Sequence, residues 1–113
     1  MDILEKAFEI IELYDLYQDL LTDKQKEYFE SYYFDNYSIT EISENKDVSR
    51  NAVHDQIKKT VSKLNDYENK LKLKVLRKKR KILINKLLEV SKDDEINLLL
   101  TELKKVEWYY GFW

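Results

Sequence analysis

The residues of this chain that are best suited to chemistry form a short polar and basic run near its middle. An arginine can donate two hydrogen bonds to O6 and N7 of guanine, and an asparagine can pair in the same way with N6 and N7 of adenine. Serine and lysine side chains suit phosphate oxygens. These residue types stand close together at Ser49, Arg50, Asn51, His54, Lys58 and Lys59. We therefore take these residues as candidates for contact with a nucleic acid.

A second basic run, KLKLKVLRKKRK, follows at residues 70–81, where eight of twelve residues are basic. One interpretation is a surface that follows the phosphates of RNA or DNA and binds less tightly as salt rises. The other is an ordinary solvated helix face whose charges pair with acidic residues elsewhere in the chain, and the sequence does not separate the two. The candidate residues of this basic surface are Lys70, Lys72, Lys74, Arg77, Lys78, Lys79, Arg80 and Lys81.

Charge is unevenly distributed along the chain, although the formal net charge is only -2. Residues 1–48 hold 4 Lys and Arg against 13 Asp and Glu, a net of -9. Residues 49–86 hold 13 against 3, a net of +10, and residues 87–113 hold 3 against 6, a net of -3. A basic middle within an acidic chain favours a polyanionic partner.

Composition excludes several kinds of site. The chain has no cysteine, which excludes disulfides and thiolate metal sites, and its single histidine cannot make the multi-histidine site that zinc prefers. Its only glycine, Gly111, leaves no glycine-rich phosphate loop. We therefore predict a protein that is not an enzyme and that holds no metal and no cofactor.

The N-terminal stretch is acidic and amphipathic, which is not typical of a signal peptide. No apolar run approaches the roughly 18 residues that a membrane span needs. We therefore expect a cytoplasmic protein without membrane contact.

One glycine, no proline and many Leu, Ile, Lys and Glu residues predict an all-α fold. Apolar residues recur at helical spacing over residues 3–17. Further helix starts are expected at Thr22 and Ser38, each with a Gln or Glu three residues later in a capping box, then at Ser49 and near residues 91–94. Two starts only 11 residues apart leave room for one short helix and a turn, which is the geometry of a helix-turn-helix. Whether residues 49–90 form one helix or two stays open, with a break expected near residues 72–75.

In a helix-turn-helix the first helix crosses the DNA backbone and the second enters the major groove. The residues expected to hold the two helices together are the apolar Ile39, Ile42, Val48, Val53 and Ile57 and the small Ser43 and Ala52. The remaining side of the second helix would then face outward and present the candidate nucleic-acid-binding residues.

Three residues depart from a standard helix-turn-helix. Asp47 occupies the corner, where glycine is common, and would take the left-handed conformation at a modest cost. Lys46 occupies an apolar packing position, where its stem can pack while its charge reaches water. Asp55 on the outward side would repel phosphates. These features weaken the argument for tight DNA reading but not the argument for the fold.

The aromatic residues are expected to pack rather than to bind. Helical spacing favours a core role over base stacking for Tyr28, Tyr32, Tyr33 and Tyr37. The terminal aromatic cluster at residues 108–113 is expected to contact a second copy of the chain or the first helix. The apolar stripe at residues 83–106 is long for so small a chain, so a homodimer is predicted.

The segments LTDKQKEYFESYY, DNYSITEIS and VSRNAVHDQIKK, within residues 21–60, resemble region 4 of the sigma-70 type factors, and more closely the YlxM-like family of small bacterial proteins. The resemblance implies an all-α, sigma-4-like helix-turn-helix bundle with additional long C-terminal helices. It also implies a DNA-binding regulator or an accessory factor of the signal recognition particle, with DNA, the particle's RNA or its protein component as the partner.

We accordingly expect a helix-turn-helix domain over residues 1–70 and a C-terminal helical extension over residues 71–113. The competing hypothesis is a protein-interaction or assembly factor whose helix-turn-helix serves only as a scaffold.

Overall fold

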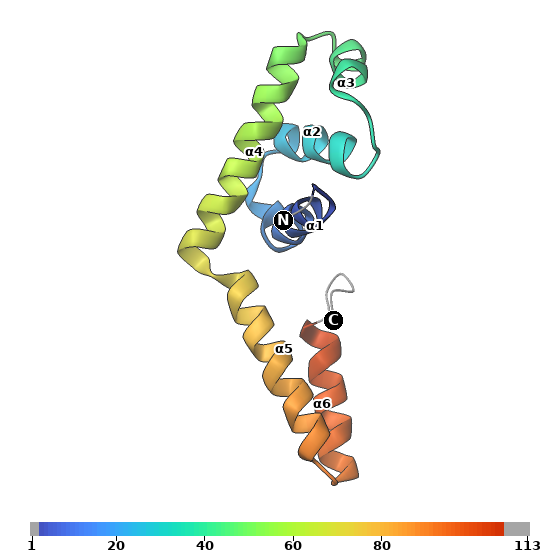
Figure 1. Cartoon of the computed structure of the whole chain (residues 1–113), viewed down its shortest axis with the longest axis vertical. Helices are drawn as coiled ribbons and strands as arrows, with labels where there is room; N and C mark the ends of the chain where they lie inside the picture. Colours follow the sequence, from blue (N-terminus) through green and yellow to red (C-terminus); the bar gives the residue numbers. More distant parts are fainter. Residues whose placement is uncertain (1–2, 108–113) are drawn as a thin grey trace. The chain divides into compact units, whose positions relative to one another are not determined.

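Every regular element in the described part of the chain is helical (Figure 1). The computed structural model describes residues 3–107. Its helices are α1 (Ile3–Tyr17), the 3-10 helix η1 (Gln18–Leu20), α2 (Asp23–Tyr33), α3 (Ile39–Lys46), α4 (Arg50–Leu71), α5 (Leu73–Val90) and α6 (Asp94–Glu107). The chain folds as two units, Met1–Leu71 and Lys72–Trp113. The all-α prediction is confirmed.

The starts of α2 and α3 are fixed by the capping boxes that the sequence predicts. Thr22 Oγ1 accepts a hydrogen bond from the Gln25 N–H at 3.1 Å, and the Thr22 N–H donates to Gln25 Oε1 at 2.8 Å. Ser38 and Glu41 repeat the arrangement with two bonds of 3.1 Å. Ser49 Oγ caps α4 by accepting from the N–H three residues later at 3.0 Å. Each bond satisfies a backbone N–H that a helix start otherwise leaves without an intrahelical partner.

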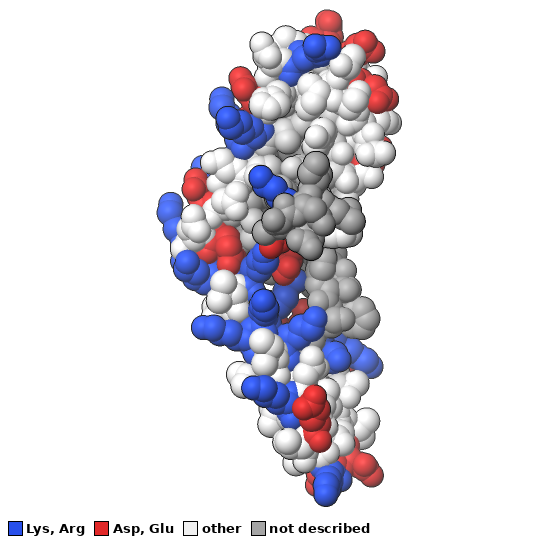
Figure 2. All heavy atoms as spheres, in the orientation of Figure 1, with Lys and Arg blue, Asp and Glu red and all other residues white. Residues whose placement is uncertain are grey.

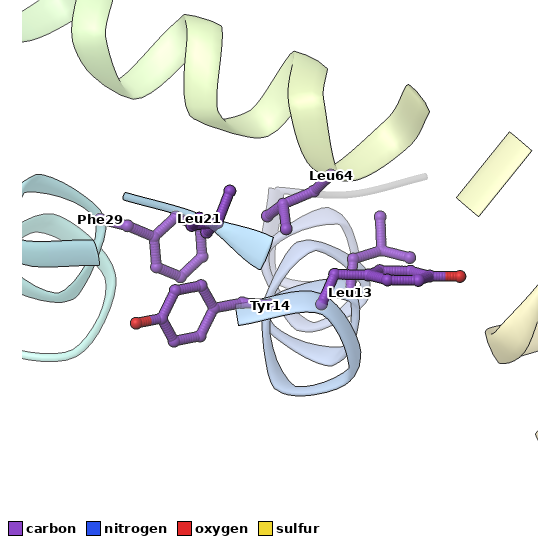
Figure 3. Packing of buried hydrophobic residues seen from close by; sticks show 6 residues of the cluster. Leu13, Tyr14, Leu21, Phe29 and Leu64 are labelled. Carbon is purple, nitrogen blue, oxygen red and sulfur yellow. The ribbon is translucent and has the colours of Figure 1, made fainter. Parts of the chain in front are cut away.

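The core of the first unit is an aromatic and aliphatic cluster contributed by α1, α2 and α4 and by Leu21, which follows η1 (Figure 3). The Tyr14 and Phe29 rings stack with 4.2 Å between their centroids and 7° between their planes. Phe29 also stacks on Tyr33 at 4.5 Å. Leu64 of α4 joins the cluster and is fully buried. Burial of large apolar side chains is the main favourable term in folding, so this cluster holds α4 against the two N-terminal helices.

Two tyrosine hydroxyls tie the C-terminal half of α4 to the N-terminal helices of the same unit. Tyr17 Oη donates to Glu68 Oε1 at 2.7 Å. Tyr67 Oη donates to the carbonyl of Leu20 at 3.3 Å. These bonds give the polar ends of the rings partners while the ring bodies pack, so this end of α4 is anchored in the first unit.

The corner between α3 and α4 is a left-handed turn at Asp47, with φ 53° and ψ 49°. The Val48 N–H donates to the Ser43 carbonyl at 3.0 Å, and the Asp47 N–H donates to the Glu44 carbonyl at 3.4 Å. This pair of bonds is the Schellman pattern, which satisfies the last carbonyls of a helix. The left-handed aspartate that the sequence predicts is therefore confirmed, and it lets α4 begin shortly after α3 ends.

Replacing Asp47 by glycine is expected to stabilise the first unit by up to about 1 kcal/mol, because glycine adopts a positive φ without the steric clash of a Cβ. The matched control is Asn45→Gly inside α3, which should destabilise by a few tenths of a kcal/mol, because glycine has a lower helix propensity than asparagine. Urea unfolding followed by circular dichroism measures both free energies. A loss of stability in Asp47→Gly would mean that the aspartate side chain itself supports the corner.

The long helical run that starts at Arg50 is two helices rather than one. Lys72 takes a left-handed φ of 60° between α4 and α5, within the range where the sequence predicts a break. The aromatic cluster at residues 108–113, which was expected to make an interface or to pack on α1, lies outside the described residues.

The second unit contains the neighbouring helices α5 and α6, joined by residues 91–93 (Figure 1). Ile84 of α5 and Leu100 of α6 are its buried apolar side chains within residues 72–107. Arg80 Nε lies 2.8 Å from Glu107 Oε1, which links the two helices by an ion pair. Asp93 Oδ1 caps α6 by accepting a backbone N–H at 3.0 Å, close to the predicted start at residues 91–94.

Candidate nucleic-acid interface

The helix-turn-helix has its own small core, which fixes α4 against α3. The buried residues of this core are Tyr28, Ile42, Val53 and Ile57, with Ile39 packed against them. Ser43 is also buried, and its hydroxyl donates to the Thr40 carbonyl at 2.7 Å. The predicted packing is therefore confirmed for these α3 and α4 residues. Val48 and Ala52 are exposed instead. Val48 precedes Ser49, which caps α4, and Ala52 lies 100° round the helix from the buried Val53.

Lys46 occupies its apolar packing position in the way that the sequence suggests. Its side chain is largely buried, and its ammonium group lies 5.2 Å from the centroid of the Tyr28 ring. The same group pairs with the carboxylate of Glu27 on α2. A lysine can pack its stem while its charge finds a partner, so Lys46 links α3 to α2 instead of weakening the motif.

Every residue that the sequence proposes for nucleic-acid contact is exposed on the N-terminal half of α4 or at its cap, and we call this exposed surface the outward side of α4. Ser49, Arg50, Asn51, His54, Lys58 and Lys59 are all exposed. At 100° per residue, positions 51, 55, 58 and 59 lie opposite the inward-facing Val53 and Ile57, and position 54 lies on the flank. Arg50 lies within about 60° of the two inward-facing residues, but it stands in the first turn of α4 and is exposed there, with its Nη1 3.5 Å from Thr40 Oγ1 of α3. The exposed side chains at positions 50, 51, 54, 55, 58 and 59 thus form the polar surface of the N-terminal half of α4.

This surface is polar and mostly positive, with one exception. Arg50, Lys58 and Lys59 carry positive charge, whereas Asp55 carries negative charge within the same surface. Asp55 Oδ1 lies 4.0 Å from Nδ1 of His54. The arrangement can donate hydrogen bonds to phosphates and base edges, and the aspartate opposes part of that attraction.

The basic run at residues 70–81 does not form one continuous exposed strip. Lys70 belongs to α4 in the first unit, and the rest belong to the second unit. Lys72, Lys78, Lys79 and Arg80 are exposed, Lys74 and Lys81 are half-buried, and Arg77 is only 8% exposed. Figure 2 shows Lys and Arg side chains gathered where Figure 1 draws α5.

Helical spacing accounts for this division of the basic run. Arg77 and Lys81 stand seven and three residues before the buried Ile84, so they share its side of α5. They therefore differ from the solvent-facing charges that the sequence led us to expect. Arg80 is exposed but is paired with Glu107 of α6, so part of the positive charge is balanced within the second unit.

The tyrosines that were expected in the core divide into two groups. Tyr28 is buried and Tyr33 is half-buried, whereas Tyr32 and Tyr37 are 38% and 42% exposed. Burial, and then the neighbouring Tyr32 phenol, raise the pKa of Tyr33 above its ordinary value. The core-packing prediction therefore describes only Tyr28 and Tyr33.

Tyr32 and Tyr37 line a groove in the first unit that the sequence did not predict. Its volume is about 690 Å³, and α1 contributes Phe8 and Ile11 to its wall. The close spacing of these tyrosines in the sequence was the one pattern that could have indicated an aromatic groove. Their neighbour Tyr33 also lines the groove but packs against the core, and the packing of α1 beside α2 decides which rings stay exposed.

No helix among residues 3–107 is long and apolar enough to cross a membrane. Over the same described residues, no group of three or more His, Cys, Asp or Glu side chains is placed to hold a metal ion.

Comparison with known proteins agrees with this architecture. Residues 4–105 match the model of a family described as "Putative helix-turn-helix protein, YlxM / p13 like". The chain is 44% identical over 108 residues to the UPF0122 protein YlxM of Bacillus subtilis (strain 168), an alignment that covers 92% of this chain and 98% of that relative. It is also 44% identical over 110 residues to a UPF0122 protein of Anoxybacillus flavithermus, covering 93% and 100%. The chain therefore belongs to the YlxM/p13-like family of helix-turn-helix proteins.

Proposed function

We propose that this protein binds nucleic acid through the outward side of α4. The observation that carries the proposal is that Arg50, Asn51, His54 and Lys58 are exposed on the second helix of a helix-turn-helix whose core is complete without them. In such motifs this helix lies in the major groove, where arginine and asparagine read base edges. Membership of a helix-turn-helix family supports the same interface.

The finer proposal is a cytoplasmic, non-enzymatic regulator or accessory factor that acts on DNA or on the RNA of the signal recognition particle. Its support is the resemblance of residues 21–60 to sigma-4-like and YlxM-like sequences. Arg50, Lys58 and Lys59 on one exposed helix suit the phosphates of either nucleic acid. Exposed lysines of the second unit, such as Lys78 and Lys79, would add affinity that is independent of sequence.

A salt titration tests the proposal. Fluorescence anisotropy with a labelled DNA duplex and a labelled RNA hairpin should give log affinity that falls linearly with log salt between about 50 and 200 mM. Three phosphate contacts from α4 predict a slope of about -2 to -3 on duplex DNA. The probe that the protein binds more tightly identifies the class of nucleic acid. A protein that binds neither probe at the lowest salt does not have the proposed function.

The competing candidate is a protein-interaction factor, with the protein component of the signal recognition particle as partner and the helix-turn-helix as a scaffold. Asp55 favours this candidate, because an exposed carboxylate on the outward side of α4 repels phosphates. Nuclease treatment of a lysate before capture separates the two candidates. Partners that are lost after treatment favour nucleic acid, and partners that persist favour the scaffold.

A further inference from the structure

The second unit leaves a long apolar stripe exposed on each of its helices. On α5 the stripe is Leu76, Leu83, Leu87 and Val90, and on α6 it is Ile96, Leu99, Leu103 and Val106. The spacings are seven, four and three residues on α5 and three, four and three on α6. Such spacing keeps each stripe on one side of its helix.

Both stripes lie on the same side of the helix pair. At 100° per residue, the centre of the α5 stripe lies about 90° round the helix from the buried Ile84. The centre of the α6 stripe lies at a similar angle from the buried Leu100, and both angles are measured in the same rotational sense. Because α5 and α6 are antiparallel neighbours (Figure 1), equal turns in the same sense bring both stripes to one surface. We call this surface of eight side chains the apolar face.

We propose that the apolar face is the interface of a homodimer, in which two α5–α6 pairs pack face to face as a four-helix bundle. Eight partly exposed aliphatic side chains offer on the order of 500–800 Å² per copy, which approaches the roughly 800 Å² per partner of a standard stable interface. A second copy presents a face of the same size, as an isologous twofold contact requires.

The small core of the second unit supports the same conclusion. Its buried apolar side chains within residues 72–107 are Ile84 and Leu100. A unit of 42 residues lies close to the size of about 40 residues below which oligomerisation, a metal or disulfides are usually needed for a sufficient core. The described part of this unit contains no cysteine and no metal-binding cluster, and packing the apolar face against a second copy would supply the missing core.

Charges at the rim of the apolar face select how the two copies meet. Lys79 and Lys86 lie seven residues apart along the outer edge of the α5 stripe, and Glu95 and Glu102 lie seven apart along the outer edge of the α6 stripe. Packing α5 against α5 of the partner would bring the two lysine edges together. Packing α5 against α6 of the partner brings each lysine edge to a glutamate edge, with every neighbouring pair of helices antiparallel.

Light scattering after size-exclusion chromatography of the full chain should give twice the chain mass of 13.8 kDa. The test variant is Leu99→Asp, which places a charge in the buried centre of the interface and should shift the protein to a monomer. The control is Leu98→Asp. Leu98 and Leu99 are similarly exposed, at 69% and 64%, but Leu98 lies 100° further round α6 and outside the apolar face. Leu98→Asp should therefore stay dimeric.

A charge exchange tests the pairing of α5 with α6. Lys86→Glu should weaken the dimer several-fold, and Lys86→Glu combined with Glu102→Lys should restore it, because the two edges regain opposite signs. Circular dichroism confirms that each variant keeps its helices. A wild-type monomer, or a Leu99→Asp variant that stays dimeric, overturns the interface. A charge exchange without rescue overturns the pairing of α5 with α6. These measurements do not depend on nucleic-acid binding, so either proposal can fail without the other.

Discussion

Replacing Phe29 by alanine is expected to lower the free energy of unfolding by about 3–5 kcal/mol, the usual range for a large buried aromatic side chain. Phe29 is 0% exposed, and its ring stacks on those of Tyr14 and Tyr33. Alanine would remove both contacts and leave a cavity between α1 and α2. Since small domains have a total stability of about 5–15 kcal/mol, much of the native state of the first unit would be lost. Urea unfolding followed by circular dichroism measures the change.

The matched control for Phe29 is Phe8→Ala on α1. Phe8 is the same residue type but is 57% exposed in the wall of the groove, so its replacement should change stability by no more than about 0.5 kcal/mol. The difference between the two variants measures burial rather than residue type. Equal losses at both positions would contradict the core built around Phe29.

Local signals were enough to predict where the helices begin and how the helix-turn-helix is made. A capping box is decided by two residues three positions apart, so the box of Thr22 with Gln25, and the similar box at Ser38, could be predicted without a structure. The corner at Asp47 was predictable because Asp47 lies between two capped helix starts and aspartate tolerates the left-handed conformation. The outward side of α4 was predictable for a related reason, since the period of its apolar residues defines the inward side.

Environments that depend on packing between helices could not be predicted in the same way. Arg77 stands beside Lys78 in a run of basic residues, and the two have nearly the same sequence context. One is buried and the other is exposed because they lie 100° apart on α5. The contact of Lys46 with Glu27 joins two helices whose relative position no local pattern fixes. The groove beside Tyr32 likewise depends on where α1 lies.

Reversing two charges on the outward side of α4 is expected to weaken nucleic-acid binding roughly 100-fold, since contacts of about 1–3 kcal/mol each give way to repulsion. The variant is Arg50→Glu combined with Lys58→Glu. Both side chains are exposed, so the fold should persist. The slope of log affinity against log salt should become shallower by about 2, because two positive charges that release counterions are removed. Anisotropy titrations with the same probes measure both quantities.

The control is Lys6→Glu combined with Lys24→Glu, which changes the net charge by the same amount outside the helix-turn-helix. Both lysines are exposed in the first turns of α1 and α2, where a negative side chain is favourable near the positive end of the helix dipole. This variant should keep most of the affinity. If both double variants lose affinity equally, binding follows overall charge and not the α4 surface. If neither loses affinity, α4 does not contact the nucleic acid, and the helix-turn-helix serves as a scaffold.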